Sequence, residues 1–340
     1  MGSSVTRVAI VAVAAAWGAV GGDTTRPATQ VATVSFVGRH HANSDANSTS
    51  FDWVGSGFRV QLPPSGGLPV GGNVTADLDF GGPAVGLAVY AGTAETSLRM
   101  IQPPAGHRGR VTVVLASVVD VVSLPGDVLT VRKVTEPFGA DTPTTLFAVR
   151  VGGGRPIAAA PGCDLSDEVP LRNRPTPSPP PPSPFRIDVY GDSDTAAWGV
   201  DGSTAMPDRV CFAEQRLLED FEDGWVRGVA RRLGDPLTAA PADVFVQAVS
   251  GIGVLRPAAL GGRGPAAASA TLPDLLNRSL ELVPGAHFEP HGWRPDVVVV
   301  YVGSNDYLPG PSPPPPPRVF SAAYTHMIER IAALYGPGPP

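Results

Sequence analysis

The feature that most constrains the fold of this 340-residue chain is a proline tract, PTPSPPPPSP, at 175–184. Proline lacks a backbone N–H and has a fixed φ angle, so neither a helix nor a central strand can continue through the tract. A segment of this composition forms an extended, semi-rigid spacer. We therefore predict two folded units, at about 31–165 and 185–340, joined by a linker at 170–184.

The residues before the linker have the pattern of an all-β unit. Strand-like segments rich in Val, Phe and Thr alternate with turns of Gly, Pro, Asn and Asp, and no helical period is evident. These segments lie at 31–36, 51–60, 74–80, 85–90, 111–122, 128–134 and 146–151. Seven or eight short strands of this kind predict a β-sandwich of the jelly-roll type.

The residues after the linker alternate between strand and helix. Strand-like runs at 185–189, 244–249 and 297–302 are interspersed with helical patterns at 225–233 and 319–334. This order predicts a parallel sheet covered by helices. The run at 297–302 is apolar throughout, which is typical of a strand buried on both faces. The predicted fold class is thus an all-β sandwich followed by an α/β, flavodoxin-like unit.

The N-terminus has the pattern of a secretory signal peptide. One basic residue, Arg7, precedes an apolar run at 8–20 and then Gly21, and the run is too short to span a bilayer comfortably. Met1-Gly2 followed by Thr6 also fits N-myristoylation, which is the alternative. No later segment is long and apolar enough for a membrane span. We predict a signal peptide at 1–21 and a secreted protein.

The net charge and the cysteine content exclude some classes of protein. The net charge is −6 and no basic stripe exists to neutralise phosphates, which argues against a nucleic-acid partner. Glycosylation sequons begin at Asn47, Asn73 and Asn277, as suits a secreted protein. Cys163 and Cys211 form no metal-binding cluster, and the sequence leaves open whether they pair or stay free.

Each of the three predicted parallel strands ends in a small polar motif. Ser193 lies in GDS at 191–193, Gly251 in SGIG at 250–253, and Asn305 in GSND at 303–306. Ligands bind at the carboxyl ends of the strands in open α/β sheets, where these loops would meet. Acyl transfer needs a nucleophile together with hydrogen-bond donors aimed at the developing oxyanion. A serine hydroxyl, a glycine N–H and an asparagine amide could fill these roles.

These three motifs resemble the first three blocks of the SGNH (GDSL-type) hydrolases. More narrowly, the whole chain resembles carbohydrate esterase family two, through FDWVGSGFRV at 51–60, LTVRKVTEPF at 129–138 and PDVVVVYVGSND at 295–306. The resemblance implies an N-terminal jelly roll ahead of an SGNH domain. It also implies a secreted serine esterase that removes acetyl groups from polysaccharides through an acyl-enzyme, with no cofactor and no metal.

The resemblance also assigns roles to individual residues. Ser193 would be the nucleophile, and its backbone N–H, Gly251 and Asn305 would form the oxyanion hole. Asp192 would hydrogen-bond the turn that presents the serine. The chain departs from the family at Asp194, where an apolar residue is usual; a charge beside the nucleophile needs a partner or solvent.

The general base is the largest departure. The family's catalytic histidine lies in a final block near the C-terminus, and the 340 residues contain no such block. The histidines that are present are expected to be surface or loop residues: His40, His41, His107, His287, His291 and His326. Because serine is a poor nucleophile without a base, we expect the sequence to represent an incomplete gene product with little turnover.

Two other functions remain open at this point. Asp194 and the absent base would also suit a carbohydrate-binding or interaction protein whose hydrolase half has lost its activity. Alternatively, the serine chemistry could act on a lipid ester, which would require an apolar groove for the acyl chain. The sequence does not decide between acetylated polysaccharide and these alternatives.

Overall fold

A computed structural model describes the greater part of the chain. The described residues are 8–10, 33–43, 48–62, 72–83, 85–92, 97–117, 128–137, 141–152, 157–158, 185–200, 219–234, 242–258, 270–290, 293–309 and 313–336. The predicted linker at 170–184, together with Cys163 and Cys211, lies outside them. In the described part, no helix is long and apolar enough to cross a membrane.

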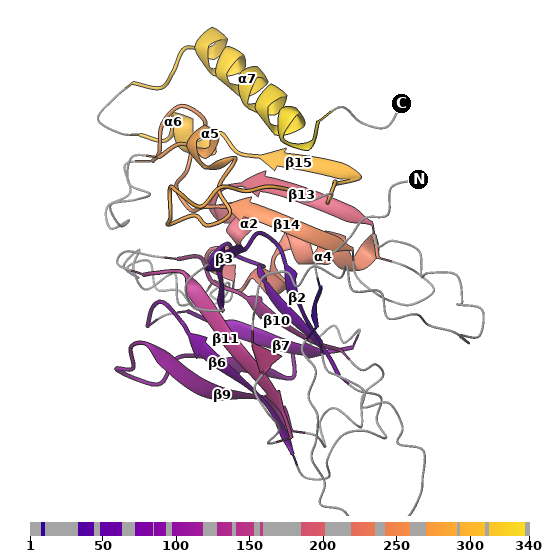
Figure 1. Ribbon diagram of the computed structural model, residues 1–340. Coiled ribbons are helices and arrows are strands. Elements are labelled where there is room, and N and C mark those ends of the chain that lie inside the picture. The colour runs from indigo at the N-terminus through magenta and orange to yellow at the C-terminus, as the bar shows by residue number, and fades with distance from the viewer. Residues whose placement is uncertain are drawn as a thin grey trace, which may run out of the picture.

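The first unit consists of two antiparallel sheets, drawn in indigo to magenta in Figure 1. One sheet has the order β1-β2-β5-β10-β7-β8, and the other has the order β3-β4-β11-β6-β9 with β12 beside β11. The strands of the first sheet are β1 (Val8–Ile10), β2 (Thr33–Val37), β5 (Gly57–Gln61), β7 (Leu87–Ala91), β8 (Arg99–Ile101) and β10 (Val128–Lys133). Those of the second are β3 (His41–Asn43), β4 (Ser48–Phe51), β6 (Asn73–Asp79), β9 (Arg110–Ser117), β11 (Thr144–Val151) and β12 (Ile157–Ala158).

The two sheets face each other across one hydrophobic core. Phe58 and Leu87 from the first sheet and Leu78 and Leu115 from the second are fully buried in it. Alternate residues of a strand point to opposite faces, so each strand supplies its inward side chains to this core. The β-sandwich predicted from the sequence is therefore present.

The strands differ from the prediction in detail. The segment at 51–60 is not one strand but the last residue of β4, a turn and then β5. Gly55 makes this turn possible, because its φ of 75° is a left-handed conformation that favours glycine. The short strands β3, β8 and β12 were not predicted. Strand β1 pairs with β2, the rest of 1–21 lies outside the described residues, and the signal peptide stays a prediction.

The second unit is a parallel sheet in the order β14-β13-β15, as the alternation of strand and helix predicted. Its strands are β13 (Arg186–Gly191), β14 (Asp243–Ala248) and β15 (Val297–Tyr301). The first strand in sequence is central, so the chain moves to one side for β14 and to the other for β15. This arrangement places a topological switch point, where open α/β sheets bind ligands, at the carboxyl end of β13.

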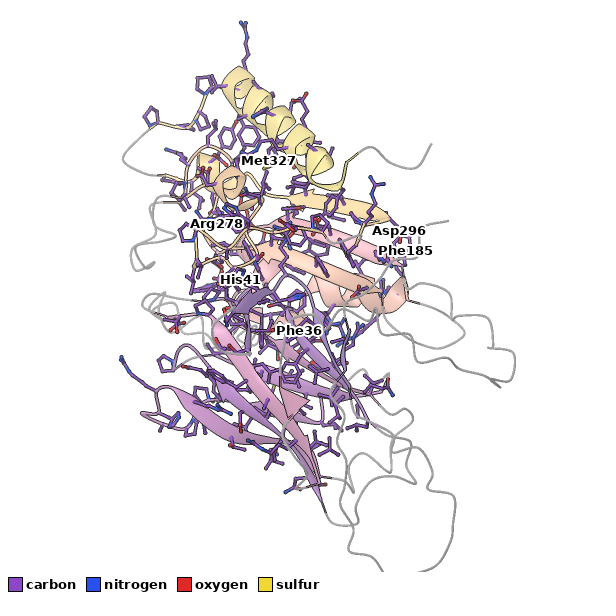
Figure 2. All side chains as sticks on the ribbon, viewed as in Figure 1. Phe36, His41, Phe185, Arg278, Asp296 and Met327 are labelled. Carbon is purple, nitrogen blue, oxygen red and sulfur yellow. The ribbon has the colours of Figure 1, made fainter. Side chains whose placement is uncertain are left out.

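Helices cover both faces of this sheet (Figure 1). The helical segments are α2 (Ser193–Ala196), η4 (Phe221–Asp223), α4 (Trp225–Arg232), α5 (Leu272–Leu275), α6 (Ser304–Tyr307) and α7 (Pro317–Tyr335). Val226 and Ala230 of α4 pack against one face, and Met327 and Ile331 of α7 pack against the other. Figure 2 shows Met327 on the side of α7 that faces the sheet. Both long helices agree with the sequence pattern.

The prediction that β15 is buried on both faces is wrong. Val297 and Val298 are 43% and 40% exposed, and Tyr301 is 54% exposed. The physical reason is position: β15 is an edge strand, whereas β14 at the other edge lies beside β2 of the sandwich. An apolar composition reports that a strand can be buried, but it does not report which edge of the sheet the strand occupies.

The two units share buried contacts of both apolar and polar kinds. Val54, Tyr90 and Val134 of the sandwich belong to the same core as α4 and β13. Arg39 of the sandwich is fully buried, and its guanidinium donates to the Tyr190 hydroxyl at 2.8 Å in β13. The sandwich is thus part of the framework on which the parallel sheet rests.

Candidate active site

The strand register brings the three predicted motifs to one edge of the sheet. Gly191, the last residue of β13, pairs with Ala248 of β14 and with Tyr301 of β15. All three strands therefore end at the same level. Ser193 follows two residues beyond this level, and the loops that carry Gly251 and Asn305 start beside it.

Ser193 is the first residue of the short helix α2. Asp192 is its N-cap residue, and the Asp192 side chain accepts a hydrogen bond from the backbone N–H of Asp194 at 3.3 Å. Gly191 is required here, because an added Cβ would overlap the hydroxyl of the buried Thr195. The Ser193 side chain is partly exposed, and its hydroxyl has no hydrogen-bond partner among the described residues. It is therefore available to a ligand.

The Asp192 carboxylate connects the loop after β13 to the loop after β15. It accepts hydrogen bonds from the Ser304 hydroxyl at 2.9 Å and from the Asn305 amide at 3.3 Å. Burial raises the pKa of this carboxyl, and the hydrogen bond from Ser304 partly offsets the shift. Asp192 thus caps the turn that presents Ser193 and also contacts the loop after β15, a contact that the sequence did not indicate.

The turn at 249–252 leaves one backbone donor available. The N–H of Val249 donates to Gly191, that of Ser250 to the Glu136 carboxylate, and that of Ile252 to the Val249 carbonyl. The N–H of Gly251 alone has no partner within the described residues of the chain. Gly251 has a φ of 75°, which only glycine adopts without strain. This free donor is the kind that an oxyanion hole needs.

Asn305 reaches both neighbouring loops. Its side-chain nitrogen donates to the Ile252 carbonyl at 2.7 Å and contacts the Asp192 carboxylate at 3.3 Å. Asn305 is buried, whereas Ser304 beside it is exposed. To serve an oxyanion, the amide would exchange its longer contact, the one with Asp192, for the ligand.

Sequence reasoning missed the residue that holds two of these loops together. Asp306 is fully buried, and its carboxylate accepts the backbone N–H groups of Val254, Leu255 and Arg256 at 2.8, 2.7 and 3.1 Å. The Arg256 guanidinium in turn donates to the Asp306 carbonyl at 2.8 Å. The aspartate of the GSND motif could have indicated this role, because aspartate side chains in loops often bind backbone N–H groups.

No described histidine contacts Ser193. His326 lies on the exposed side of α7 beside Glu329, and His287 pairs with Arg278 in an isolated bridge. His291 lies outside the described residues. Asp194 is exposed, so solvent supplies the hydration that its charge requires. In the described part, no group of three or more His, Cys, Asp or Glu residues is placed to hold a metal ion.

An antiparallel sandwich joined to a parallel α/β sheet, with a serine at the topological switch point, defines a two-unit architecture. Solved structures that are similar to this chain include family two carbohydrate esterases. One from Clostridium thermocellum, in complex with cellohexaose, has a TM-score of 0.60 and 21% identity; the match covers 89% of this chain and 74% of that one.

Two further structures extend the comparison. A family two carbohydrate esterase with a carbohydrate-binding domain, from Corynascus thermopiles (Myceliophthora fergusii), gives a TM-score of 0.55 at 22% identity, over 89% of this chain and 74% of that one. An acetyl xylan esterase from Butyrivibrio proteoclasticus gives 0.52 at 15% identity, over 80% and 62%. No protein-family model and no curated protein sequence matches the chain. The resemblance to carbohydrate esterase family two is thus confirmed as a likeness of fold.

Proposed function

We propose that this protein is a secreted serine esterase that removes O-acetyl groups from polysaccharides. The observation that carries the proposal is the meeting of three loops at the carboxyl edge of the parallel sheet. Asp192, Asn305 and Ile252 are linked there by hydrogen bonds, next to a serine hydroxyl and a glycine N–H that have no hydrogen-bond partner in the described part of the chain. The fold that the chain shares with carbohydrate esterases supports an acetylated polysaccharide as substrate.

Each functional group of the candidate site has one part in the proposed reaction. The Oγ atom of Ser193 forms a bond to the acetyl carbonyl carbon, and the hydroxyl proton passes to a general base. The N–H groups of Ser193 and Gly251 and the Asn305 amide stabilise the negative oxygen of the tetrahedral intermediate. Collapse of this intermediate breaks the bond between the carbonyl carbon and the sugar oxygen, and the leaving oxygen takes the proton back from the general base to become a free hydroxyl. Water then hydrolyses the acetyl-serine and releases acetate.

The general base is not assigned to a residue of this chain. The family resemblance implies that the base is a histidine. The jelly-roll form of the sandwich, the SGNH character of the α/β unit and secretion through the segment 1–21 belong to the same proposal. Asn73 and Asn277 are exposed, which suits glycosylation of a secreted protein.

The test is acetate release by the purified protein from acetylated xylan and from a nitrophenyl acetate. Ser193→Ala should lower turnover by about three orders of magnitude or more, because the nucleophile is lost. Ser35→Ala, on β2 of the sandwich, is the matched control and should leave turnover unchanged. Equal acetate release by Ser193→Ala and the wild type would contradict the mechanism.

A carbohydrate-binding protein without esterase activity is the second candidate. The observation that favours it is the lack of any contact between Ser193 and a described histidine. Binding of acetylated xylan without acetate release, and with the same affinity in Ser193→Ala, would identify this function. Turnover of a long-chain nitrophenyl ester in preference to the acetate would instead identify a lipid esterase.

A further inference from the structure

A buried carboxylate of the sandwich contacts the candidate active site. Glu136 lies three residues after β10 and is 4% exposed. Its Oε2 atom accepts a hydrogen bond from the backbone N–H of Ser250 at 2.7 Å, and Ser250 is fully buried. The two residues are 114 positions apart in sequence and belong to different units. Ser250 immediately precedes Gly251, the candidate oxyanion donor.

This contact fixes the Val249–Ser250 peptide, which immediately precedes the peptide that carries the Gly251 N–H. The neighbouring backbone groups of the turn bind within the α/β unit: Val249 N–H to the Gly191 carbonyl, and the Gly251 carbonyl to the N–H of Ala258. The Ser250 N–H alone is directed out of that unit, toward Glu136. Without this acceptor, the Val249–Ser250 peptide could rotate, and the adjoining Ser250–Gly251 peptide, which carries the Gly251 N–H, would change its direction as well.

Glu136 is itself held in place. Its backbone N–H donates to the carboxylate of Glu219 at 3.0 Å, and the N–H of Phe221 donates to the carbonyl of Val134 at 3.0 Å. These bonds join the segment after β10 to the segment that leads into α4. The Lys133 ammonium, which is buried beside them, donates to the Thr135 carbonyl. The Glu136 carboxylate is thus presented by a rigid framework.

The charges around Glu136 are compatible with this role. Burial, followed by the nearby Glu136 carboxylate, raises the pKa of Glu219 well above its ordinary value. The Lys133 ammonium opposes this shift and the Glu281 carboxylate adds to it. A raised pKa favours the neutral form of Glu219, and that form limits the like-charge repulsion between two adjacent buried carboxyl groups.

We propose that Glu136 is a positioning residue for the reaction: by binding the Ser250 N–H, the sandwich directs the Gly251 N–H toward the acyl oxygen of the substrate. This inference rests on the proposed function, because it takes Gly251 as an oxyanion donor. It gives the sandwich a role in catalysis that is separate from any binding of carbohydrate.

The experiment compares Glu136→Ala with Glu136→Gln. Alanine removes the acceptor, so kcat on a nitrophenyl acetate should fall by about 10- to 100-fold with KM within about twofold, since an oxyanion donor acts in the transition state. Glutamine keeps a carbonyl oxygen at the same place and should retain kcat within about threefold. The control is Asp52→Asn, a buried carboxylate of the same interface that binds the N–H groups of Glu281 and Leu282 instead. It should lower thermal stability without changing kcat.

Amide hydrogen exchange supplies a readout that does not depend on turnover. Exchange in the peptide spanning 249–253 should rise by about tenfold in Glu136→Ala and should stay at the wild-type rate in Asp52→Asn. The proposal is overturned when Glu136→Ala keeps wild-type kcat and wild-type exchange there, whatever its stability. A wild-type protein without Ser193-dependent turnover would refute the proposed function. The exchange experiment would still show whether the contact between Glu136 and Ser250 orders the turn.

Discussion

The carboxylate of Asp306 lies 2.8 Å from the backbone nitrogen of Val254, and this bond ties the loop after β15 to the loop after β14. Asp306 also binds the two following N–H groups, so one buried side chain satisfies three backbone donors. The carboxylate and the candidate donors Gly251 and Asn305 lie on the same two loops. The position of the oxyanion site is therefore coupled to Asp306.

The first prediction concerns the loss of this carboxylate. Asp306→Ala leaves three backbone N–H groups without their acceptor, of which that of Val254 is buried, and should lower the free energy of unfolding by about 2–3 kcal/mol. Because both donor loops lose a shared support, kcat should fall by about tenfold or more. Urea unfolding and ester kinetics check the two effects. Asp274→Ala removes an exposed capping carboxylate from α5 and should cost about 1 kcal/mol without affecting kcat.

The second prediction concerns the glycine before the serine turn. Gly191→Ala places a Cβ on the Thr195 hydroxyl, which is buried, so the turn must shift. We expect a loss of stability of about 1–3 kcal/mol and a fall in kcat, because Ser193 is two residues away. The matched substitution is Gly228→Ala in α4, where an added Cβ meets nothing within 4 Å. That variant should be more stable by about 0.5–1 kcal/mol. Equal effects from the two substitutions would contradict this account.

The main features of the α/β unit could be predicted from the sequence because each of its strands and long helices is encoded by a short, continuous stretch of residues. The strands ending at Gly191 and Tyr301 have continuous patterns, and the ends of parallel strands share one edge of a sheet. The exposure of Val297 could not be predicted, since a strand's composition does not reveal that it lies at an edge. The predicted domain boundaries and the roles of the site residues remain predictions.

The buried charges between the units could not be predicted either. Arg39, Glu136 and Glu219 each have a sequence context typical of surface residues. Their partners lie far away along the chain: Tyr190 is 151 residues from Arg39, and Ser250 is 114 residues from Glu136. Only the packing of the sandwich against the sheet brings them together. The local spacing of apolar residues that identifies strands and helices contains no information about such contacts.

The third prediction tests Arg39 as a connection between the units. Its guanidinium donates to the Leu276 carbonyl at 2.5 Å and to Tyr190, and it stacks 3.9 Å from the centre of the Phe288 ring. Arg39→Lys keeps the charge but loses the planar fork and the stacking, so it should not rescue Arg39→Met. Both variants should lose about 3 kcal/mol or more in urea unfolding, because buried carbonyls lose their donor. Arg99→Met removes an exposed arginine and should cost less than about 0.5 kcal/mol.

The last prediction concerns the pH dependence of stability through Asp52. Burial raises the pKa of this carboxyl to about 6, although the N–H groups of Leu282 and Glu281 oppose the shift. Lys133 and Arg278 are the charged groups that also lower it. The folded state therefore holds a proton that the unfolded state releases near pH 4. The contribution of Asp52 to the free energy of unfolding is therefore fully present below about pH 4 and is lost as the pH rises through about 6.

Asp52→Asn removes this titration. A shift of about two pKa units corresponds to about 3 kcal/mol, so the difference in unfolding free energy between the wild type and Asp52→Asn should change by about 2–3 kcal/mol between pH 4 and pH 7. Urea unfolding at intervals across this range measures it. Thr144→Val removes a buried hydroxyl that donates to the Phe80 carbonyl at 2.9 Å, and its difference from the wild type should stay constant with pH. Parallel curves for the wild type and Asp52→Asn would show that Asp52 keeps its ordinary pKa in the folded protein.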